Sequence, residues 1–399
     1  MGQDRARRAK IRAVRVYLDH NGTTPLRADV RERYLELLDG GLGNASATHT
    51  SGRRARAVVD EAREQVAAAL GVPEEWLIFT SGGTEANNTA LRGVLAAAGP
   101  GSGLLTSAVE HSSVLETAEV LARAGHAHQT VAVSPSGALD LDDLDRALAL
   151  APPRLVSIMA ANNETGACTP MDAVAERLAT LGKERPVWHS DVVQALGKCP
   201  LTLKDWDVDL ASLSAHKVGG PIGVGVLVRR PSIALPPLLT GGGQEVGARS
   251  GTENVAGIGA AALAIELAVA EQASYAERAL ELTQRLWQGV RQLAPEARLV
   301  GPPLEVKPRL PNTLCVLLEG VDGRSLIARL DLEGVEASLG SACSSGAIEP
   351  SHVLLAMGFD EANARAGLRL SLGRTTSHED VHTAVEKMGK ALQGLAATG

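Results

Sequence analysis

The chain has 399 residues, of which 45% are hydrophobic and 21% are charged. This composition is typical of a globular protein and excludes a chain that is disordered as a whole. The formal net charge of −7 argues against a protein that binds nucleic acid through bulk positive charge. No apolar run reaches the roughly 18 residues of a membrane span. We therefore expect neither a nucleic acid nor a membrane as a partner.

Four cysteines stand at positions 168, 199, 315 and 343, and none forms a C-x-x-C pair. This spacing argues against a zinc ribbon, and no secretory leader precedes them to favour a disulfide framework. The basic stretch at 5–15 contains no serine, so it is interpreted as a solvated arm and not as a transit peptide. We expect reduced thiols, no metal site and a cytoplasmic protein.

Helical and strand-like segments alternate from about residue 54 onward. Helices are expected over 56–70, 84–98, 112–124, 141–150 and 171–181, and strands over 76–80, 104–107, 131–133, 155–159, 187–189, 210–213 and 224–228. This alternation predicts an α/β fold with a mostly parallel, doubly wound sheet.

The pattern changes in the last third of the chain. Long helices are expected over 254–269 and 275–293. Short strands over 297–300, 314–318 and 368–372 then mix with helices over 324–330, 351–356 and 378–395. We therefore expect a large domain over 26–275. Residues 1–25 and 276–399 are expected to form a smaller α+β domain that carries the loop around Cys343.

A glycine-rich turn, TSGGTE at 80–85, joins an expected strand to an expected helix. Gly83 lets the backbone approach an anion, the helix start offers free N–H groups, and Thr84 adds a hydroxyl. The turn is consistent with a phosphate cradle, and equally with a simple tight turn.

A second motif, SAHK at 214–217, follows an apolar strand and enters a glycine-rich loop. Lysine is the residue that forms Schiff bases with carbonyl compounds. Lys217 is therefore either such a lysine or a strand-end lysine that reaches solvent.

Three further groups occupy the same kind of position. Asp191 and Gln194 follow one strand, His111 follows another, and Asn163 follows a third. Each has a plain structural alternative: a helix cap for Asp191, a structural histidine, and a turn around Asn163. All these motifs lie where a strand ends, which is the ligand edge of an open α/β sheet. Together they match the needs of pyridoxal phosphate.

The loop GSACSSG at 340–346 surrounds Cys343 with small residues. A buried structural cysteine is expected among bulky apolar residues, as Cys315 is. An exposed thiol can become a thiolate and act as a nucleophile, although an incidental loop cysteine is the alternative.

The chain resembles the cysteine desulfurases, which are pyridoxal-phosphate enzymes of the class V aminotransferase superfamily. The matching motifs run from YLD at 17–19 to LSLGR at 370–374, in the family's order and spacing. GSACSSG followed by EPSHVL at 349–354 is similar to the subgroup related to the nitrogen-fixation and housekeeping enzymes. The resemblance implies a fold-type I pyridoxal-phosphate enzyme.

The resemblance also implies a role for each motif residue. Lys217 corresponds to the Schiff-base lysine, Asp191 to the partner of the pyridinium nitrogen, and Gln194 to the donor to the ring hydroxyl. His111 corresponds to the histidine that stacks on the ring and moves protons.

The phosphate site implied by the resemblance consists of Gly83, Thr84, Ser214 and His216. Thr252 matches a residue that reaches the phosphate of the neighbouring subunit, which implies a homodimer.

For the substrate side, the resemblance implies that Asn163, which also touches the cofactor, and Arg369 bind the carboxylate of L-cysteine. Cys343 matches the cysteine that takes the sulfur as a persulfide. The implied products are L-alanine and sulfur for an acceptor protein such as an iron–sulfur scaffold.

Three positions depart from the family pattern. Gly22 and Gly83 stand where alanine is more common, and no basic residue follows Pro221. The rival activities are a selenocysteine lyase and a class V aminotransferase, which needs no Cys343. A catalytically silent scaffold is the non-enzymatic alternative, against which the presence of Lys217, Asp191 and Cys343 argues.

Overall fold

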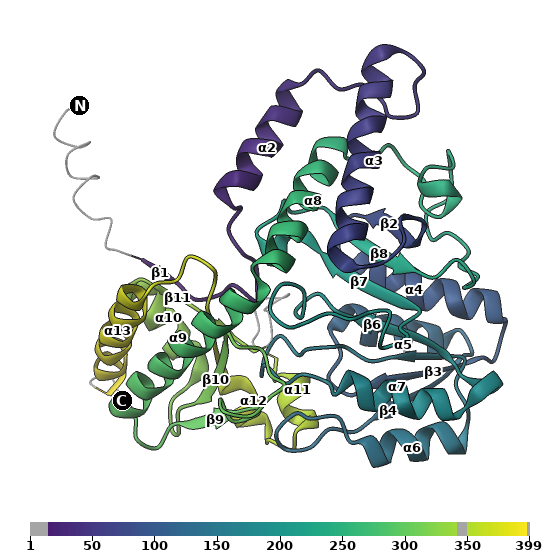
Figure 1. The fold of residues 1–399 in the computed structure, drawn as a ribbon. Helices are drawn as coiled ribbons and strands as arrows, with labels where there is room; N and C mark the ends of the chain where they lie inside the picture. Colours follow the sequence, from purple (N-terminus) through teal and green to yellow (C-terminus); the bar gives the residue numbers. More distant parts are fainter. Residues whose placement is uncertain (1–14, 341–348, 397–399) are drawn as a thin grey trace.

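A seven-stranded sheet forms the centre of the larger part of the molecule (Figure 1). The computed structural model describes residues 15–340 and 349–396. The strands lie in the order β2-β8-β7-β6-β5-β3-β4. Their bounds are β2 (Leu77–Thr80), β3 (Gly103–Ser107), β4 (Ala127–Val131), β5 (Leu155–Ser157), β6 (Val187–Asp191), β7 (Leu210–Ser214) and β8 (Gly225–Arg229). The pairs from β7 to β4 are parallel, and β8 runs antiparallel to both of its neighbours. The predicted mostly parallel sheet is confirmed.

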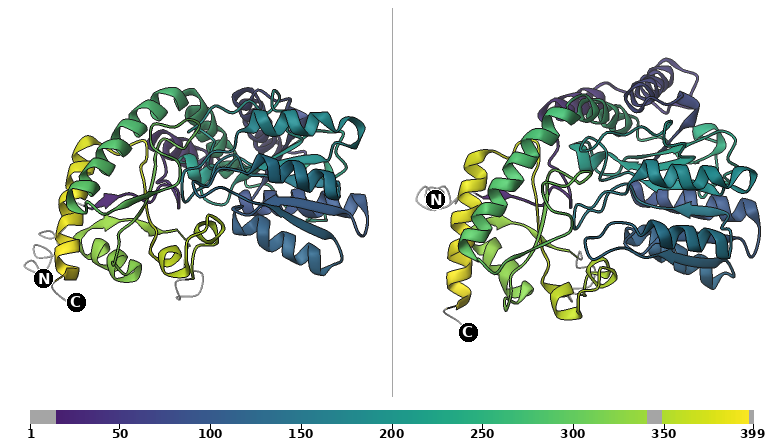
Figure 2. Two further views of the ribbon diagram at one scale, coloured as in Figure 1. Left: turned by 90° about the horizontal axis from the view of Figure 1, so that it is seen from below. Right: turned by 60° about the horizontal axis from the view of Figure 1, so that its bottom comes forward.

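Helices cover both faces of this sheet, as a doubly wound fold requires (Figure 2). They are α3 (Thr50–Leu70), α4 (Gly83–Ala98), α5 (Ser112–Arg123), α6 (Leu141–Leu150), α7 (Met171–Thr180) and α8 (Val255–Ala270). Along β5, Leu155 packs with the core under α4 and α5, whereas Val156 packs with the core under α3, α6, α7 and α8. Alternate strand residues therefore face opposite cores, and both faces are buried.

A second, smaller region contains a four-stranded antiparallel sheet in the order β12-β13-β10-β9. Its strands are β9 (Arg298–Val300), β10 (Thr313–Leu317), β12 (Ser338–Leu339) and β13 (Leu368–Ser371). Its helices are α9 (Gln272–Leu293), α10 (Gly323–Glu333), α11 (His352–Ala356), α12 (Glu361–Ala366) and α13 (His378–Ala396). β1 (Val16–Tyr17) pairs with β11 (Val335–Glu336) beside this sheet. Residues 16–17 thus contact the C-terminal third of the chain. The division into domains at residue 275 stays a prediction.

Among the expected elements, two begin farthest from their expected positions. The strand expected at 131–133 is β4 at 127–131, because Val133 instead bridges to Leu139 and closes a turn. The helix expected from residue 56 begins at Thr50, where the ring of His49 accepts a hydrogen bond from the Gly52 amide and caps it.

Several elements were not expected from the sequence. They are α2 (Ala28–Asp39), α12, β11, β12 and the short 3-10 turns η1 (Glu74–Trp76), η2 (Gly182–Glu184), η3 (Ala215–Val218) and η4 (Glu245–Gly247). On α2 only Val30 and Leu37 are buried, so its apolar face is too narrow to produce a clear helical period. Within the described ranges, no single helix is long and apolar enough to cross a bilayer. The pair α8 and α9 passes that test only together, with a bend of 70° between them.

Candidate active site

The predicted site residues meet at one edge of the large sheet. Asp191 ends β6, Ser214 ends β7, and Lys217 follows in η3. Because β6 and β7 are parallel, these ends lie at the same edge. Gly225 pairs with both Ser214 and Thr80, so the glycine-rich turn after β2 reaches this edge as well.

The turn after β2 offers a close-fitting cradle for an anion. A Cβ atom on Gly225 would lie 2.6 Å from the Cα of Gly82, and one on Gly83 would lie 2.9 Å from Val193. The first bond of α4 runs from the Ala86 amide to the Gly82 carbonyl, so the Gly83 and Thr84 amides precede the helical ladder. Amides without an intrahelical partner at the start of a 16-residue helix fit a phosphate group.

Lys217 is half-buried, and its amine is held by backbone carbonyls. Its Nζ donates to the carbonyls of Asn21 at 2.7 Å and Gly22 at 2.6 Å. Burial, reinforced by the positive charge of Arg369, lowers the pKa of Lys217 to about 8. A substantial neutral fraction is therefore available near neutral pH, as a lysine that attacks carbonyl carbon requires.

A second lysine, Lys198, lies beside this group and was missed in the sequence. Its buried Nζ donates to Oδ1 of Asn21 at 3.1 Å and to Oε1 of Gln194. Burial, and then the charge of Lys217, lower the pKa of Lys198 to about 7. Gln194 in turn donates from Nε2 to the Asn21 carbonyl at 3.0 Å. Only the four-residue spacing from Gln194 marks Lys198 in the sequence.

Asp191 is buried and oriented by two donors. Its Oδ2 accepts from Nδ2 of Asn87 at 2.8 Å, and its Oδ1 accepts from the Val193 amide at 3.0 Å. The bond from the Val193 amide resembles the helix cap that the sequence offered as an alternative for Asp191. It closes a turn, however, and no regular helix follows it. A carboxylate held in this way suits the protonated nitrogen of a pyridine ring.

A second buried acid, Glu110, lies near Asp191. Its Oε1 accepts from Ser107 Oγ at 2.5 Å and from the Met159 amide at 2.8 Å, whereas its Oε2 has no partner within the described residues. Burial, together with the charge of Asp191, raises the pKa of Glu110 to about 8. Glu110 is therefore mostly protonated at neutral pH and adds little negative charge beside Asp191.

His111 begins α5 and is exposed toward the same edge. Its Nδ1 accepts from the Ser113 amide at 3.1 Å, which leaves Nε2 as the ring nitrogen that carries the proton when the ring is neutral. Nδ2 of Asn87 donates to Ser113 Oγ at 2.9 Å as well as to Asp191. Asn87 was not singled out in the sequence. It holds Asp191 directly and contacts His111 indirectly, through Ser113.

His216 contacts Thr23, with 3.0 Å between Nδ1 and Oγ1. Burial, and then the charges of Lys217 and Lys198, lower the pKa of His216 to about 4, so its ring is neutral. Thr252 is exposed and lines a small groove of about 110 Å³ with Ser81.

Arg369 comes from β13 and is buried where the two sheets meet. Its Nη2 donates to Oδ1 of Asp19 at 2.8 Å, and its Nη1 approaches the Asn163 carbonyl at 3.5 Å. Its Nε is buried and has no partner in the described part of the chain. A free guanidinium donor of this kind fits a carboxylate ligand.

Cys343 falls outside the described residues. Both neighbours of its segment lie at the site. A Cβ atom on Gly340 would lie 2.3 Å from Oε2 of Glu164, the residue after Asn163. Ser351 Oγ donates to the same oxygen at 2.6 Å. Gly340 and Ser351, which stand on either side of residues 341–348 in the chain, therefore both lie beside Glu164.

The comparisons with known proteins agree on one family. Residues 16–383 match the family described as Aminotransferase class-V. The chain is 41% identical to "Cysteine desulfurase IscS" of Dictyoglomus turgidum, covering 95% of each protein. It is 38% identical to "Cysteine desulfurase" of Nostoc sp., covering 96% of this chain and 94% of the relative.

Solved structures lead to the same result. A "NIFS-LIKE PROTEIN" superposes with a TM-score of 0.88 at 36% identity, covering 96% of this chain and all of the other. "SspA in complex with cysteine" superposes with a TM-score of 0.76 at 29% identity, covering 90% and 98%. Members of this family use pyridoxal 5'-phosphate, which the cradle, Asp191 and Lys217 fit. The chain belongs to the cysteine desulfurases of the class-V aminotransferase family.

Proposed function

We propose that the protein removes the sulfur atom of L-cysteine, releases L-alanine, and passes the sulfur through Cys343 to an acceptor protein. The observation that carries this proposal is that Lys217 lies near enough to both Asp191 and Arg369 for their charges to act on its amine. One amine is thus close to both a cofactor cradle and a carboxylate site.

The cofactor would be held by residues from several strand ends. Gly83, Thr84, Ser214 and His216 would bind its phosphate. Asp191 would face its ring nitrogen, Gln194 its ring hydroxyl and His111 its ring face, and Asn163 would touch it from the substrate side. When bound, the cofactor supplies a sink for the electrons released from the substrate's Cα–H bond.

Lys217 would hold the cofactor and then move a proton. Its Nζ, with a pKa near 8, is neutral often enough to accept the α-proton of the substrate. The Asn21 and Gly22 carbonyls accept hydrogen bonds from this amine and keep it at the edge of the sheet.

Arg369 would orient the substrate. Its unpartnered Nε can donate to one carboxylate oxygen, while the ion pair with Asp19 keeps the guanidinium in place. Asn163, whose carbonyl also accepts from Nδ2 of Asn21 at 3.0 Å, would position its side chain beside the same carboxylate.

Cys343 would accept the sulfur. Its thiolate supplies the electron pair of the new S–S bond. The electrons of the broken C–S bond stay with the substrate carbon, which takes up a proton and leaves as alanine. The test measures alanine release from L-cysteine and maps the persulfide. We expect Cys343→Ala to lose roughly 100-fold or more in rate, because no nucleophile then accepts the sulfur.

The matched control for this test is Cys168→Ser, which should keep alanine release. Undiminished release from Cys343→Ala would overturn the persulfide step. Loss with L-cysteine but full activity with selenocysteine would favour a selenocysteine lyase.

A homodimer with Thr252 at the partner's phosphate is part of the proposal. The segment between β8 and α8, which contains Thr252, exposes apolar side chains to an unusual degree. Leu239 is 41% exposed and Val246 is 99% exposed. Exposed apolar groups on one segment are typical of a covered interface.

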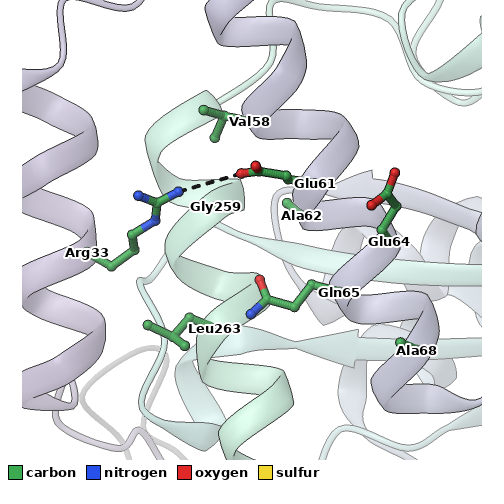
Figure 3. Close-up of a pocket in the computed structure, with 9 residues that line it drawn as sticks. All are labelled: Arg33, Val58, Glu61, Ala62, Glu64, Gln65, Ala68, Gly259 and Leu263. Carbon is green, nitrogen blue, oxygen red and sulfur yellow. Dashed lines mark ion pairs between the residues drawn. The ribbon is translucent and has the colours of Figure 1, made fainter.

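A groove of about 540 Å³ lies between α2, α3 and α8, and none of the residues that line it is a predicted site residue (Figure 3). Its walls are mainly charged and small residues, and Arg33 and Glu61 approach within 3.9 Å across it. Nothing in its chemistry suits the cofactor, so the groove is not assigned to the active site.

Sedimentation velocity tests the dimer. The wild-type protein should sediment as a dimer, and Val246→Asp should shift it toward the monomer. Thr252→Ala should weaken cofactor binding without changing the oligomeric state. A fully active wild-type monomer would contradict this part of the proposal.

A further inference from the structure

Two cysteines that have no role in the proposed reaction lie in contact. Cys168 Sγ is 3.8 Å from Cys199 Sγ, although 31 positions separate the residues in the chain. The sulfur atoms are within hydrogen-bond distance but are not covalently bonded, since a disulfide bond is about 2.05 Å long. The turn after β5 and the turn after β6 bring the two residues together, which the spacing in the sequence does not indicate.

The pair differs in burial from the third cysteine of the described residues. Cys168 and Cys199 are both partly exposed, whereas Cys315 is fully buried in β10. Burial raises the pKa of Cys315 to about 12, so it stays an inert thiol. Cys315 therefore serves as a buried control cysteine for which no sulfur contact is seen among the described residues.

The two thiols differ in pKa. The Cys168 thiol hydrogen-bonds to the Cys199 sulfur and, with the nearby charge of Lys198, lowers the pKa of Cys199. The same hydrogen bond and burial raise the pKa of Cys168. Cys199 is thus the more acidic thiol of the two, so we assign it the attacking role and Cys168 the role of the second thiol.

We propose that Cys168 and Cys199 form an intramolecular disulfide when the enzyme meets hydrogen peroxide, and that this bond weakens the cofactor site through Lys198. The Cys199 thiolate attacks one peroxide oxygen, so an S–O bond forms and the O–O bond breaks. The Cys168 sulfur then displaces that oxygen and forms the S–S bond. The sulfur atoms lose two electrons, the peroxide gains them, and the two thiol protons end in two water molecules.

The link to the cofactor site is the peptide bond between Lys198 and Cys199. Lys198 Nζ holds Oε1 of Gln194 and thereby directs the donor end of that amide away from itself. The Lys198 carbonyl accepts from Nε2 of Gln272 at 3.2 Å. Formation of the disulfide draws Cys199 toward Cys168. Because Lys198 directly precedes Cys199, this movement also shifts Lys198 and disturbs its contacts with Gln194 and Gln272. This second part rests on the proposed function, because it assigns Gln194 to the cofactor.

The first experiment maps thiols in the holoenzyme after treatment with hydrogen peroxide. Free thiols are alkylated, the protein is digested without reductant, and the peptides are identified by mass spectrometry. We expect a linked peptide pair that contains Cys168 and Cys199 and that separates after dithiothreitol, with Cys315 alkylated as before. Free Cys168 and Cys199 at peroxide doses that oxidise Cys343, or a disulfide of either residue with Cys343, would overturn the proposal.

The second experiment measures cofactor affinity, because peroxide also oxidises Cys343 and makes activity uninformative. Dialysis should show that oxidised wild type binds pyridoxal phosphate about threefold to tenfold more weakly than reduced wild type, the effect of about one lost hydrogen bond. Cys168→Ser treated in the same way should keep its affinity. Equal affinity of oxidised and reduced wild type would overturn the link through Lys198. Failure of the reduced protein to bind the cofactor would instead contradict the proposed function, and the thiol map would still decide the disulfide.

Discussion

The two ends of the candidate site are built in different ways. The ring end, around Asp191 and Lys217, comes from consecutive strand ends of one parallel sheet, and its polar groups are held by hydrogen bonds. The substrate end, around Arg369, is assembled from β13, the segment after β1 and the turn after β5, and it leaves one buried donor without a partner in the described residues. The ring end is thus organised for a resident group, and the substrate end for a ligand that comes and goes.

The largest expected effect comes from the amine at the ring end. Lys217→Ala should lower the rate of alanine release by roughly 1,000-fold or more, since it removes both the covalent partner of the cofactor and the proton acceptor. Steady-state assays and the visible absorption of the holoenzyme measure this. Lys198→Met, measured at saturating cofactor, is the matched control, because it removes a buried amine from the same cluster and should keep the absorption band. A wild-type rate in Lys217→Ala would end this assignment.

Two buried acids at the ring end, Asp191 and Glu110, should differ in their effect on the rate. Asp191→Asn removes the charge proposed to face the ring nitrogen, and we expect about a 100-fold loss of kcat. Glu110→Gln replaces an acid that is mostly protonated at neutral pH, so its kcat should change by about twofold or less. Stopped-flow or steady-state rates at pH 7 compare the two. Equal losses of kcat in both variants would contradict the claim that Asp191 provides the negative charge and that Glu110 is mostly protonated.

At the substrate end the effect should fall on binding. Arg369→Lys keeps the charge but removes the planar fork and its Nε donor, so KM for L-cysteine should rise about 10-fold to 100-fold with a smaller change in kcat. The control is Arg365→Lys, an exposed arginine of α12 paired with Glu361. A fall in kcat at unchanged KM would place Arg369 in the chemical step and not in binding.

The last expected effect concerns the free energy of unfolding and its dependence on pH, with activity unaffected. Folded Glu110 keeps its proton up to about pH 8, whereas its ordinary pKa is 4.5. Between these values the folded state binds more protons than the unfolded chain, so this contribution is complete below pH 4.5 and is lost as the pH rises through 8. Its slope is at most about 1.4 kcal/mol per pH unit. Urea unfolding should show that the free energy of unfolding of Glu110→Gln falls less steeply from pH 6 to 8 than that of the wild type. An unchanged slope would contradict the raised pKa of Glu110.

The same contrast explains what the sequence predicts well. Parallel strands with buried faces produce apolar runs that end in polar motifs, so the positions of Asp191, Ser214 and Lys217 follow from local pattern and the geometry of α/β sheets. The contribution of Arg369 follows only from the family resemblance, because an arginine inside a strand has no local signature of a binding role.

Several of the contacts missed in the sequence are long-range. Asn21 contacts Asn163, Gln194, Lys198 and Lys217, yet it stands near the chain start with no motif that predicts these partners. The contact of Cys168 with Cys199 also depends on how two turns after neighbouring strands approach each other. Such pairings are set by tertiary packing, which spacing along the chain does not encode.

The central claim is that Lys217, and not its neighbour Lys198, binds the cofactor covalently. Borohydride reduction of the holoenzyme fixes the cofactor to whichever lysine holds it, and peptide mapping by mass spectrometry then identifies that residue. The account predicts the phosphopyridoxyl group on Lys217 with Lys198 unmodified. The label on Lys198, or a holoenzyme that borohydride leaves unlabelled, would contradict it.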